Sequence, residues 1–238
     1  MVKFIRYRKI FKLYEALQPY LKYSLKLEKK LPARKALVIA PHQDDEAIGC
    51  GGTIHLHVKQ GGTASVIYCT GGGDTRKKEA IAAADVLGLS DPVFMDYRDE
   101  SLSARKDFAR ELAELLREKK PEIVFAPFHL DNHTDHRAVN EALIKAGKNK
   151  NLDFLVYAYP VWFPLYPNLL IDISGEWDSK KRAINCYRSQ TETRDYVRMS
   201  HSLGQYWAAV KGRDIQVAES FFRASLKEYA KLGEKILG

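Results

Sequence analysis

The chain has 238 residues, of which 45% are hydrophobic and 29% charged, and its formal net charge is +8. A chain of this length and composition buries a sizeable core as one domain, which excludes a disordered or collagen-like protein. No apolar run approaches the roughly 18 residues that a membrane span needs, and the first residues lack the features of a secretory signal. We therefore expect a cytoplasmic protein.

The three cysteines, Cys50, Cys69 and Cys186, are far apart and form no C-x-x-C pair. This spacing argues against a thiolate zinc site and against a disulfide framework. We expect the cysteines to behave as small apolar side chains of the core.

The positive charge is concentrated at the N-terminus. Residues 1–35 contain eleven Lys or Arg side chains and only two acidic ones, whereas the remaining chain has 27 basic and 28 acidic side chains. Because the body is nearly neutral, we expect no nucleic-acid partner. Within the basic segment, Ile10, Tyr14, Leu17 and Leu21 recur at near-helical spacing.

The pattern predicts a basic amphipathic helical segment over residues 1–34, attached to a domain over residues 35–238. Two roles for this segment stay open. It packs on its own domain with a solvated basic face, or residues 1–30 make a peripheral contact with an anionic membrane surface, at the inner membrane.

From residue 36 onward, short apolar runs alternate with amphipathic stretches. The runs predict strands at 36–40, 65–69, 93–95 and 122–126, and the stretches predict helices at 47–60, 75–87, 104–118 and up to about 146. Ser103 is the expected N-cap of the third helix. Four strand and helix repeats predict an α/β fold: a Rossmann-like, mostly parallel sheet with helices on both faces.

Beyond residue 153 the pattern is less regular. It predicts strands near 154–158 and 169–173 and helices near 179–187 and 217–231. The stretch from Tyr157 to Pro167 contains five aromatic residues and three prolines. Such a stretch could stack on a sugar or cover a pocket, but core packing or a subunit interface explains it equally well.

Side chains that carry chemistry follow the first and fourth predicted strands. His42 and three carboxylates come within five residues after the first, and two histidines with aspartates follow the fourth, in the run from Asp131 to His136. In a doubly wound sheet of order 3-2-1-4 these two strands are neighbours, and ligands bind at their carboxyl ends. We therefore expect both clusters to face one pocket.

Two imidazoles and one carboxylate can hold a divalent ion while one coordination position stays open for water, as in catalytic zinc sites. The adjacent Asp44 and Asp45 cannot easily both reach one ion, so one is expected to be a ligand and the other a general base. The residue types alone do not choose between Asp44 and Asp45, or between His133 and His136.

Other functions use part of this pattern. Two histidines and a carboxylate also form the site of non-haem Fe(II) oxygenases, so iron stays open, and a carbohydrate-binding protein could keep the pocket without turnover. The glycines at 49–52 and 71–73 suggest a dinucleotide site, but the G-x-G-x-x-G spacing is absent after the first strand and the acids there would repel a pyrophosphate.

The stretch from Val38 to Gly52 resembles the A-H-P-D-D-E…G-x-G-G signature of PIG-L/LmbE-like deacetylases. The stretch from His133 to His136 is similar to the H-P-D-H element of the same family, and the resemblance covers about residues 35–225. Membership would imply a zinc-dependent N-deacetylase, a hydrolase that removes an acetyl or other acyl group from an amino sugar of a glycan, glycolipid or glycoconjugate.

Carried over residue by residue, the resemblance implies roles for eight side chains. The metal ligands would be His42, Asp45 and His136, with Zn²⁺ as the metal. Asp44 would be the general base, and His133 would stabilise or protonate the intermediate, oriented by Asp135. Arg76 and Asp99 would bind the substrate.

The sequence departs from the family pattern at three positions. Gln43 and Thr134 replace the prolines usual in the two motifs, which removes no ligand. Asp131 occupies the position of a tyrosine that polarises the carbonyl in some members, so that role is not transferred. The expected partner is an N-acetyl amino sugar, and an oligomer is compatible with the pattern.

Overall fold

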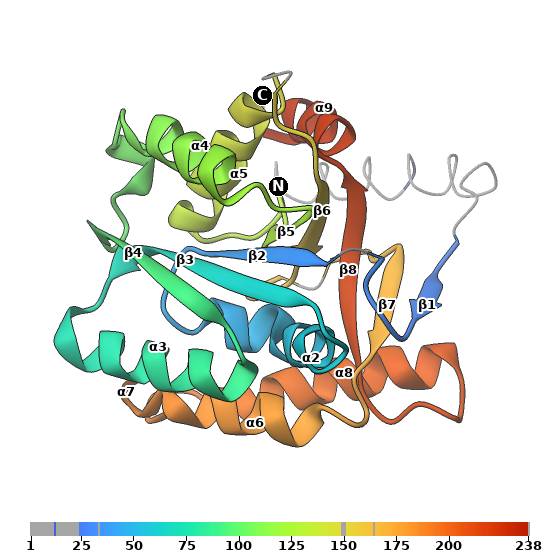
Figure 1. Cartoon of the computed structure of the whole chain (residues 1–238). Helices are drawn as coiled ribbons and strands as arrows, with labels where there is room; N and C mark the ends of the chain where they lie inside the picture. Colours follow the sequence, from blue (N-terminus) through green and yellow to red (C-terminus); the bar gives the residue numbers. More distant parts are fainter. Residues whose placement is uncertain (1–11, 13–23, 33, 149–150, 164, 238) are drawn as a thin grey trace.

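The computed structural model describes residues 12, 24–32, 34–148, 151–163 and 165–237. Its sheet has eight strands in the order β1-β7-β8-β6-β5-β2-β3-β4 (Figure 1). The strands are β1 (Lys26–Glu28), β2 (Lys35–Ala40), β3 (Thr63–Gly71), β4 (Ser90–Arg98), β5 (Ile123–Pro127), β6 (Leu155–Tyr159), β7 (Leu169–Asp172) and β8 (Ala218–Ser225).

Five neighbouring strands, from β4 through β3, β2 and β5 to β6, are parallel to one another. β8 runs antiparallel to β6 and β7, and β1 extends the sheet in parallel beyond β7. The four strands predicted first therefore lie in the order 3-2-1-4, as expected, and the prediction of a mostly parallel α/β sheet is confirmed.

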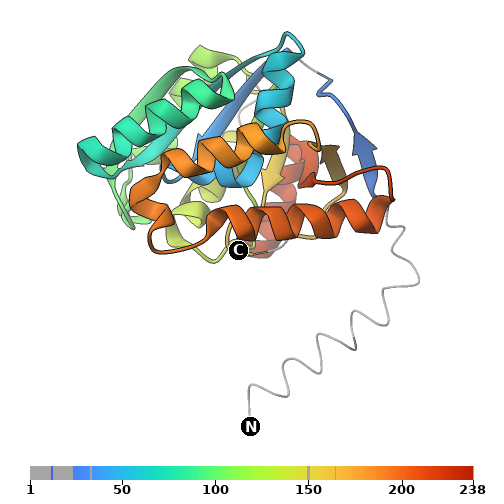
Figure 2. The ribbon, with the colours of Figure 1, turned by 90° about the horizontal axis from the view of Figure 1, so that it is seen from below.

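Helices cover both faces of the sheet. α2, α3, α6 and α8 lie on one face, which Figure 2 shows from below, and α4, α5 and α9 lie on the other (Figure 1). Their bounds are α2 (Asp45–Lys59), α3 (Gly73–Leu87), α4 (Phe108–Lys119), α5 (Thr134–Ala146), α6 (Trp177–Cys186), α7 (Arg188–Thr191), α8 (Tyr196–Lys211) and α9 (Leu226–Leu237). Among the described helices none is long and apolar enough to cross a membrane.

The apolar core consists mainly of two layers, one on each side of the sheet. Side chains alternate between the faces of a strand, so Val38 of β2 packs into one layer and Leu37 and Ile39 pack into the other. Because both faces are covered, β2 reads as a continuous apolar run and not as an alternating pattern.

Three predictions about secondary structure are wrong. Ser103 does not cap a helix, because it lies in the short 3-10 turn η2 (Leu102–Ala104), and α4 begins only at Phe108. The turn is held by the Leu102 amide, which donates to Asp135 Oδ1 at 3.0 Å. The predicted helix 217–231 is instead β8 followed by α9, and α8 was not predicted. Within the predicted helical segment 1–34, Lys26–Glu28 form strand β1.

These differences have tertiary causes. β8 lies between β6 and β7, with Phe221 in one apolar layer and Phe222 against the other, and a short apolar run of this kind cannot be told from a buried helix by its pattern. α8 buries only Tyr196, Gly204 and Ala208, so its apolar pattern is weak. Of the helical segment predicted over residues 1–34 and the membrane contact predicted for residues 1–30, the part at 1–11 and 13–23 lies outside the described residues.

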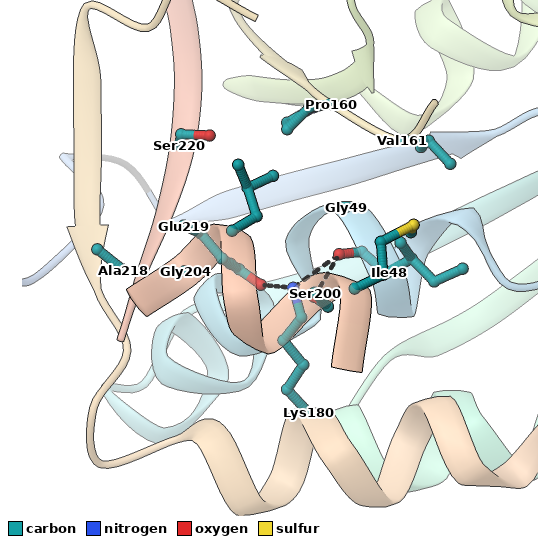
Figure 3. Close-up of a pocket in the computed structure, with 12 residues that line it drawn as sticks. Ile48, Gly49, Pro160, Val161, Lys180, Ser200, Gly204, Ala218, Glu219 and Ser220 are labelled. Atoms are coloured by element: carbon teal, nitrogen blue, oxygen red, sulfur yellow. Dashed lines mark hydrogen bonds and ion pairs between the residues drawn. The ribbon is translucent and has the colours of Figure 1, made fainter. Parts of the chain in front are cut away.

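A buried ion pair ties α2 to two other elements. Lys180 of α6 donates to Glu219 of β8 at 2.5 Å and to the Ile48 carbonyl at 2.7 Å (Figure 3). The Glu219 carboxylate also accepts the amides of Gly52 at 3.0 Å and Thr53 at 2.7 Å. The pair thereby contacts backbone groups in the middle of the helix that begins at the predicted metal site.

The loop that follows β5 is anchored by α9. The Tyr229 hydroxyl donates to Asn140 Oδ1 at 2.7 Å and lies 3.2 Å from the Pro127 carbonyl oxygen. His129 stacks on the Tyr229 ring with centroids 3.9 Å apart, and its Nε2 donates to the Tyr229 carbonyl at 3.1 Å. These contacts fix where the chain leaves the sheet toward His133 and His136.

We expect Lys180→Met to lower the free energy of unfolding by about 3–5 kcal/mol, because Glu219 would stay buried without its counter-charge. The double variant Lys180→Met/Glu219→Gln should lose less free energy of unfolding than Lys180→Met alone, since no unpaired charge remains. Urea denaturation measures both values. Lys181→Met, which removes an exposed lysine from the same helix, is the control; equal stability of Lys180→Met and this control would contradict the assignment.

Stability should also depend on pH through His129. Burial lowers the pKa of His129 to about 4, so between its ordinary value of 6.5 and 4 the unfolded chain binds more protons than the folded one. The contribution of neutral His129 to the free energy of unfolding is complete above pH 6.5. It is lost as the pH falls toward 4, by at most about 1.4 kcal/mol per pH unit. His129→Gln keeps an amide donor but does not titrate. Urea denaturation across this range should show the wild type losing stability relative to His129→Gln; a constant difference would refute the prediction.

Candidate active site

The two predicted clusters meet at the carboxyl ends of neighbouring strands. β2 pairs with β5, and the loops that follow these strands place His42 and His136 in contact. The three side chains that could act as ligands by family resemblance, His42, Asp45 and His136, are all buried.

Three atoms of these side chains form a nearly regular triangle. His42 Nδ1 lies 3.2 Å from His136 Nε2 and 3.2 Å from Asp45 Oδ2, and His136 Nε2 lies 3.1 Å from Asp45 Oδ2. Tetrahedral zinc with bonds of about 2.0–2.1 Å would separate its ligand atoms by roughly 3.3 Å. The triangle therefore fits three ligands of one small divalent ion.

The other nitrogen of each imidazole faces a carboxylate. His42 Nε2 lies 3.2 Å from Asp135 Oδ2 and 3.0 Å from Asp99 Oδ1, and His136 Nδ1 lies 3.2 Å from Asp131 Oδ2. Carboxylates at these positions keep the proton on the outer nitrogen and leave the inner nitrogen free to bind a metal. This arrangement also indicates that the inner atoms are Nδ1 of His42 and Nε2 of His136.

The cluster attracts positive charge. Burial alone would lower the pKa of both imidazoles, but Asp135, Asp45 and Asp99 raise the pKa of His42 to about 12, and Asp45 and Asp131 raise that of His136 to about 9. For Asp45, burial would raise the pKa, yet its contacts with His136 and His42 outweigh burial and lower it. A divalent cation held by the same atoms would supply the charge that these acids favour.

His42 is the common member of other candidate groups of ligands. Donor atoms of His42, His133 and His136 lie within 4.8 Å of one another, as do those of His42, Asp99 and Asp135. Among the residues that the structure describes, a divalent ion in this region would therefore have several nearby donors, with His42 in every set.

Asp44 precedes the first turn of α2 and has an unusual backbone. Its φ of 144° lies in a region that residues other than glycine rarely adopt, which is a pattern found at functional sites. Burial, followed by the charges of Asp45 and Glu46, raises the pKa of Asp44 well above its ordinary value. A buried carboxylate with a raised pKa beside the ligand triangle takes up a proton more readily than an exposed one.

His133 presents one defined nitrogen to the solvent side of the cluster. Its Nδ1 accepts the Asp135 backbone amide at 3.3 Å at the start of α5, so the proton of the neutral ring is on Nε2. Burial and then the charges of His42 and His136 lower the pKa of His133, which favours the neutral ring. His133 can therefore donate a hydrogen bond from Nε2.

The contacts of Asp135 differ from the expected ones. Its carboxylate accepts the amides of Glu100 at 2.7 Å and Leu102 at 3.0 Å, in addition to facing His42. Only its backbone N–H contacts His133. Asp135 thus links the loop after β4 to His42 and orients His133 through the main chain.

The two predicted substrate-binding residues lie at the rim of the site. Asp99 is half-exposed, and its hydrogen bond with His42 is the main cause that lowers its pKa to about 2. Arg76 of α3 is close enough to lower the pKa of Asp44 and Asp99, and its Nε is buried without a hydrogen-bond partner among the described residues.

Sequence reasoning gave no role to two acids that the structure places here. Asp131 faces His136, accepts the His133 amide at 3.2 Å and accepts the Trp162 amide at 3.2 Å. Glu46 turns away from the triangle, accepts the Tyr187 hydroxyl and is 3.3 Å from the Asp44 amide. The clustering of acids in the two motifs was the available signal, but it could not distinguish ligands from their supports.

Comparison with known proteins agrees with the geometry. The family model PIG-L, described as GlcNAc-PI de-N-acetylase, matches residues 37–147, which include both motifs. A "probable N-acetyl-alpha-D-glucosaminyl L-malate deacetylase 2" of Bacillus cereus is 30% identical over 189 residues, covering 67% of this chain and 84% of that protein.

A second relative has a different activity. The 4-oxalmesaconate hydratase of Pseudomonas putida is 30% identical over 200 residues, covering 69% of this chain and 77% of the relative. Among solved structures, a conserved protein of Thermus thermophilus is similar with a TM-score of 0.72 at 28% identity, covering 80% of this chain and 94% of that one. The sequence and the fold agree on one assignment: the chain belongs to the PIG-L family.

Proposed function

We propose that this protein is a zinc-dependent N-deacetylase that hydrolyses the N-acetyl group of an amino sugar. The observation that carries the proposal is the triangle of His42, Asp45 and His136 with the spare carboxylate of Asp44 beside it. The name of the Bacillus cereus relative and the description of the matching family point to the same bond, an acetamide on glucosamine.

In this proposal His42 Nδ1, Asp45 Oδ2 and His136 Nε2 hold the metal. A divalent ion in such a site lowers the pKa of bound water and polarises a carbonyl group. Asp99, Asp131 and Asp135 keep the imidazoles in the tautomers that binding needs. Zinc is the proposed metal, because two nitrogen donors and one carboxylate that leave an open position are typical of catalytic zinc sites.

Two groups of the chain move protons. Asp44, whose pKa is raised, accepts a proton from the water that attacks the acetamide carbonyl. His133 donates from Nε2 to the carbonyl oxygen as negative charge develops there. The proton taken up by Asp44 is then available to the departing amine, so the same carboxylate acts as base and as acid.

Other functions are less well supported. The hydratase relative makes addition of water to a carbon–carbon double bond a second candidate, since the two reactions share water activation. Membership of the PIG-L family favours hydrolysis over an Fe(II) oxygenase. A non-catalytic carbohydrate-binding protein would have no use for the strained backbone and raised pKa of Asp44.

Removal of the Asp44 carboxylate should abolish most turnover without loss of the metal. We expect Asp44→Asn to lower kcat by about 10²- to 10⁴-fold, because an amide cannot accept the proton of the attacking water. Release of primary amine from N-acetylglucosaminyl compounds measures kcat, and elemental analysis measures bound zinc. Asp96→Asn, which changes an exposed aspartate at the end of β4, should leave both unchanged.

Two results would count against the assignment. Near-normal kcat of Asp44→Asn would exclude its role as the base. Wild-type protein that releases no amine but consumes an unsaturated dicarboxylic acid, with loss of its ultraviolet absorbance, would establish the hydratase alternative.

Asp131 should act on metal affinity through His136. Asp131→Asn is expected to weaken zinc binding by about 10- to 100-fold, since a neutral amide no longer favours the required tautomer of His136 as a carboxylate does. Competition with a chromogenic chelator measures the dissociation constant. If Asp131→Asn and Asp96→Asn bind zinc equally well, the contact between Asp131 and His136 does not tune the metal site.

A further inference from the structure

A groove lies beside His133, on the side of the proposed reaction centre that opens to solvent. It has a volume of about 470 Å³ and is lined by Asn132, His133, Trp162, Arg194 and Tyr196. These residues come from the loop before α5, the loop after β6, the segment between α7 and α8, and the first residue of α8. Apart from His133, the proposed mechanism uses none of them.

Arg194 is the cation of this groove. Its guanidinium lies over the Trp162 ring at 4.9 Å from the centroid. Among the described residues no carboxylate is within ion-pair distance of Arg194, whereas Arg110 on α4 contacts Asp107, Glu111 and Glu114. A guanidinium stacked on a ring keeps its in-plane N–H donors free, and these match the two oxygens of a carboxylate or phosphate.

The wall of the groove is fixed relative to the metal triangle. The Trp162 amide donates to Asp131 Oδ2 at 3.2 Å, and the same oxygen lies 3.2 Å from His136 Nδ1. The Trp162 ring meets the edge of Tyr196 with centroids 6.0 Å apart, and Tyr196 is only 5% exposed. Trp162 and Phe163 remain 37% and 48% exposed, which leaves apolar surface at the mouth of the groove.

The charges of the two ends are opposite. Carboxylates predominate around the reaction centre, where Asp99, Asp131 and Asp135 face the two imidazoles, whereas Arg194 is a cation without a carboxylate beside it among the described residues. A substrate with an acetamide at one end and an anionic group at the other therefore fits in one orientation, with the acetamide at His133.

We propose that Trp162 and Arg194 form a subsite for a carboxylate or phosphate carried by the aglycone of the amino sugar. Arg194 binds the anion through its free N–H edge, and the exposed aromatic surface of Trp162 contacts the linking atoms. This inference rests on the proposed deacetylase function and specifies its substrate class: acetamido sugars with an anionic substituent.

The test compares substrates that differ in charge alone. N-acetylglucosaminyl malate and its dimethyl ester form one pair, and N-acetylglucosaminyl glycerol phosphate and its methyl ester form the other, so the two pairs distinguish carboxylate from phosphate. Wild-type enzyme should prefer the anion in at least one pair. Arg194→Gln should raise KM for that anion about 10- to 100-fold, the range expected for hydrogen bonds to a charged group, with kcat and the neutral ester little changed.

Arg198→Gln is the matched control, because Arg198 is an exposed arginine in the first turn of α8, four residues after Arg194, and does not line the groove. It should behave as wild type with all four compounds. Equal effects of Arg194→Gln on an anion and its ester, or the absence of any preference for the anions in the wild type, would overturn the subsite while leaving the deacetylase function intact.

If the enzyme hydrolyses none of the four compounds, that result counts against the proposed function. The subsite can then still be tested by measuring binding. The chain has three tryptophans, and Trp177→Phe/Trp207→Phe leaves Trp162 as the single tryptophan, which can be excited selectively over the tyrosines. Glucosaminyl malate should change the fluorescence of this variant, and adding Arg194→Gln should weaken the binding about tenfold or more. A titration with no fluorescence change, or with equal affinity in both variants, would overturn the subsite.

Discussion

The site depends on one constraint: three atoms from two distant parts of the chain must lie about 3.2 Å apart. His42 Nδ1 comes from the loop after β2, Asp45 Oδ2 from the first residue of α2, and His136 Nε2 from the first turn of α5. Pairing of β2 with β5 brings the two loops together, but pairing alone does not set side-chain positions to a few tenths of an ångström. The imidazole positions are set by Asp99, Asp131 and Asp135, each of which contacts the outer nitrogen of an imidazole.

The same acids connect the site to its surroundings. Asp135 accepts two amides of the segment after β4, and Asp131 accepts the amide of Trp162 beyond β6. A change in either loop therefore reaches an imidazole through a single carboxylate. The loops after β4, β5 and β6 are coupled in this way. The coupling explains why Trp162, in the loop after β6, keeps a fixed place relative to the ligand triangle.

Much of the fold was predictable because its signals are local. The apolar run of β2 and the helical stretch that follows it indicate their structures within about fifteen residues. β8 and α8 were missed because their structures depend on neighbours: Phe221 and Phe222 read as part of a helix until β6 and β7 lie on either side of them. In the site, residue types indicated a metal centre, but the proposed choice of Asp45 over Asp44 as the ligand rests on the backbone. The φ of 144° at Asp44 directs the chain so that the next carboxylate returns to accept the His42 amide at 2.9 Å, and no local pattern reveals such a torsion angle.

A deacetylase and a hydratase among the relatives imply that one arrangement can serve two reactions. Both need a water molecule made nucleophilic beside a carboxylate, and both place negative charge on an oxygen that a neutral donor can stabilise. What differs is where the electrophilic carbon lies relative to that donor. In this chain the proposed donor is His133 Nε2, on a ring whose Nδ1 accepts the Asp135 amide, and the groove beside it is lined by the cation Arg194 and by no acid. Under the proposed function, an amino sugar can place its acetamide at His133 and extend an anionic substituent along the groove toward Arg194, so the groove favours the deacetylase interpretation of this chain.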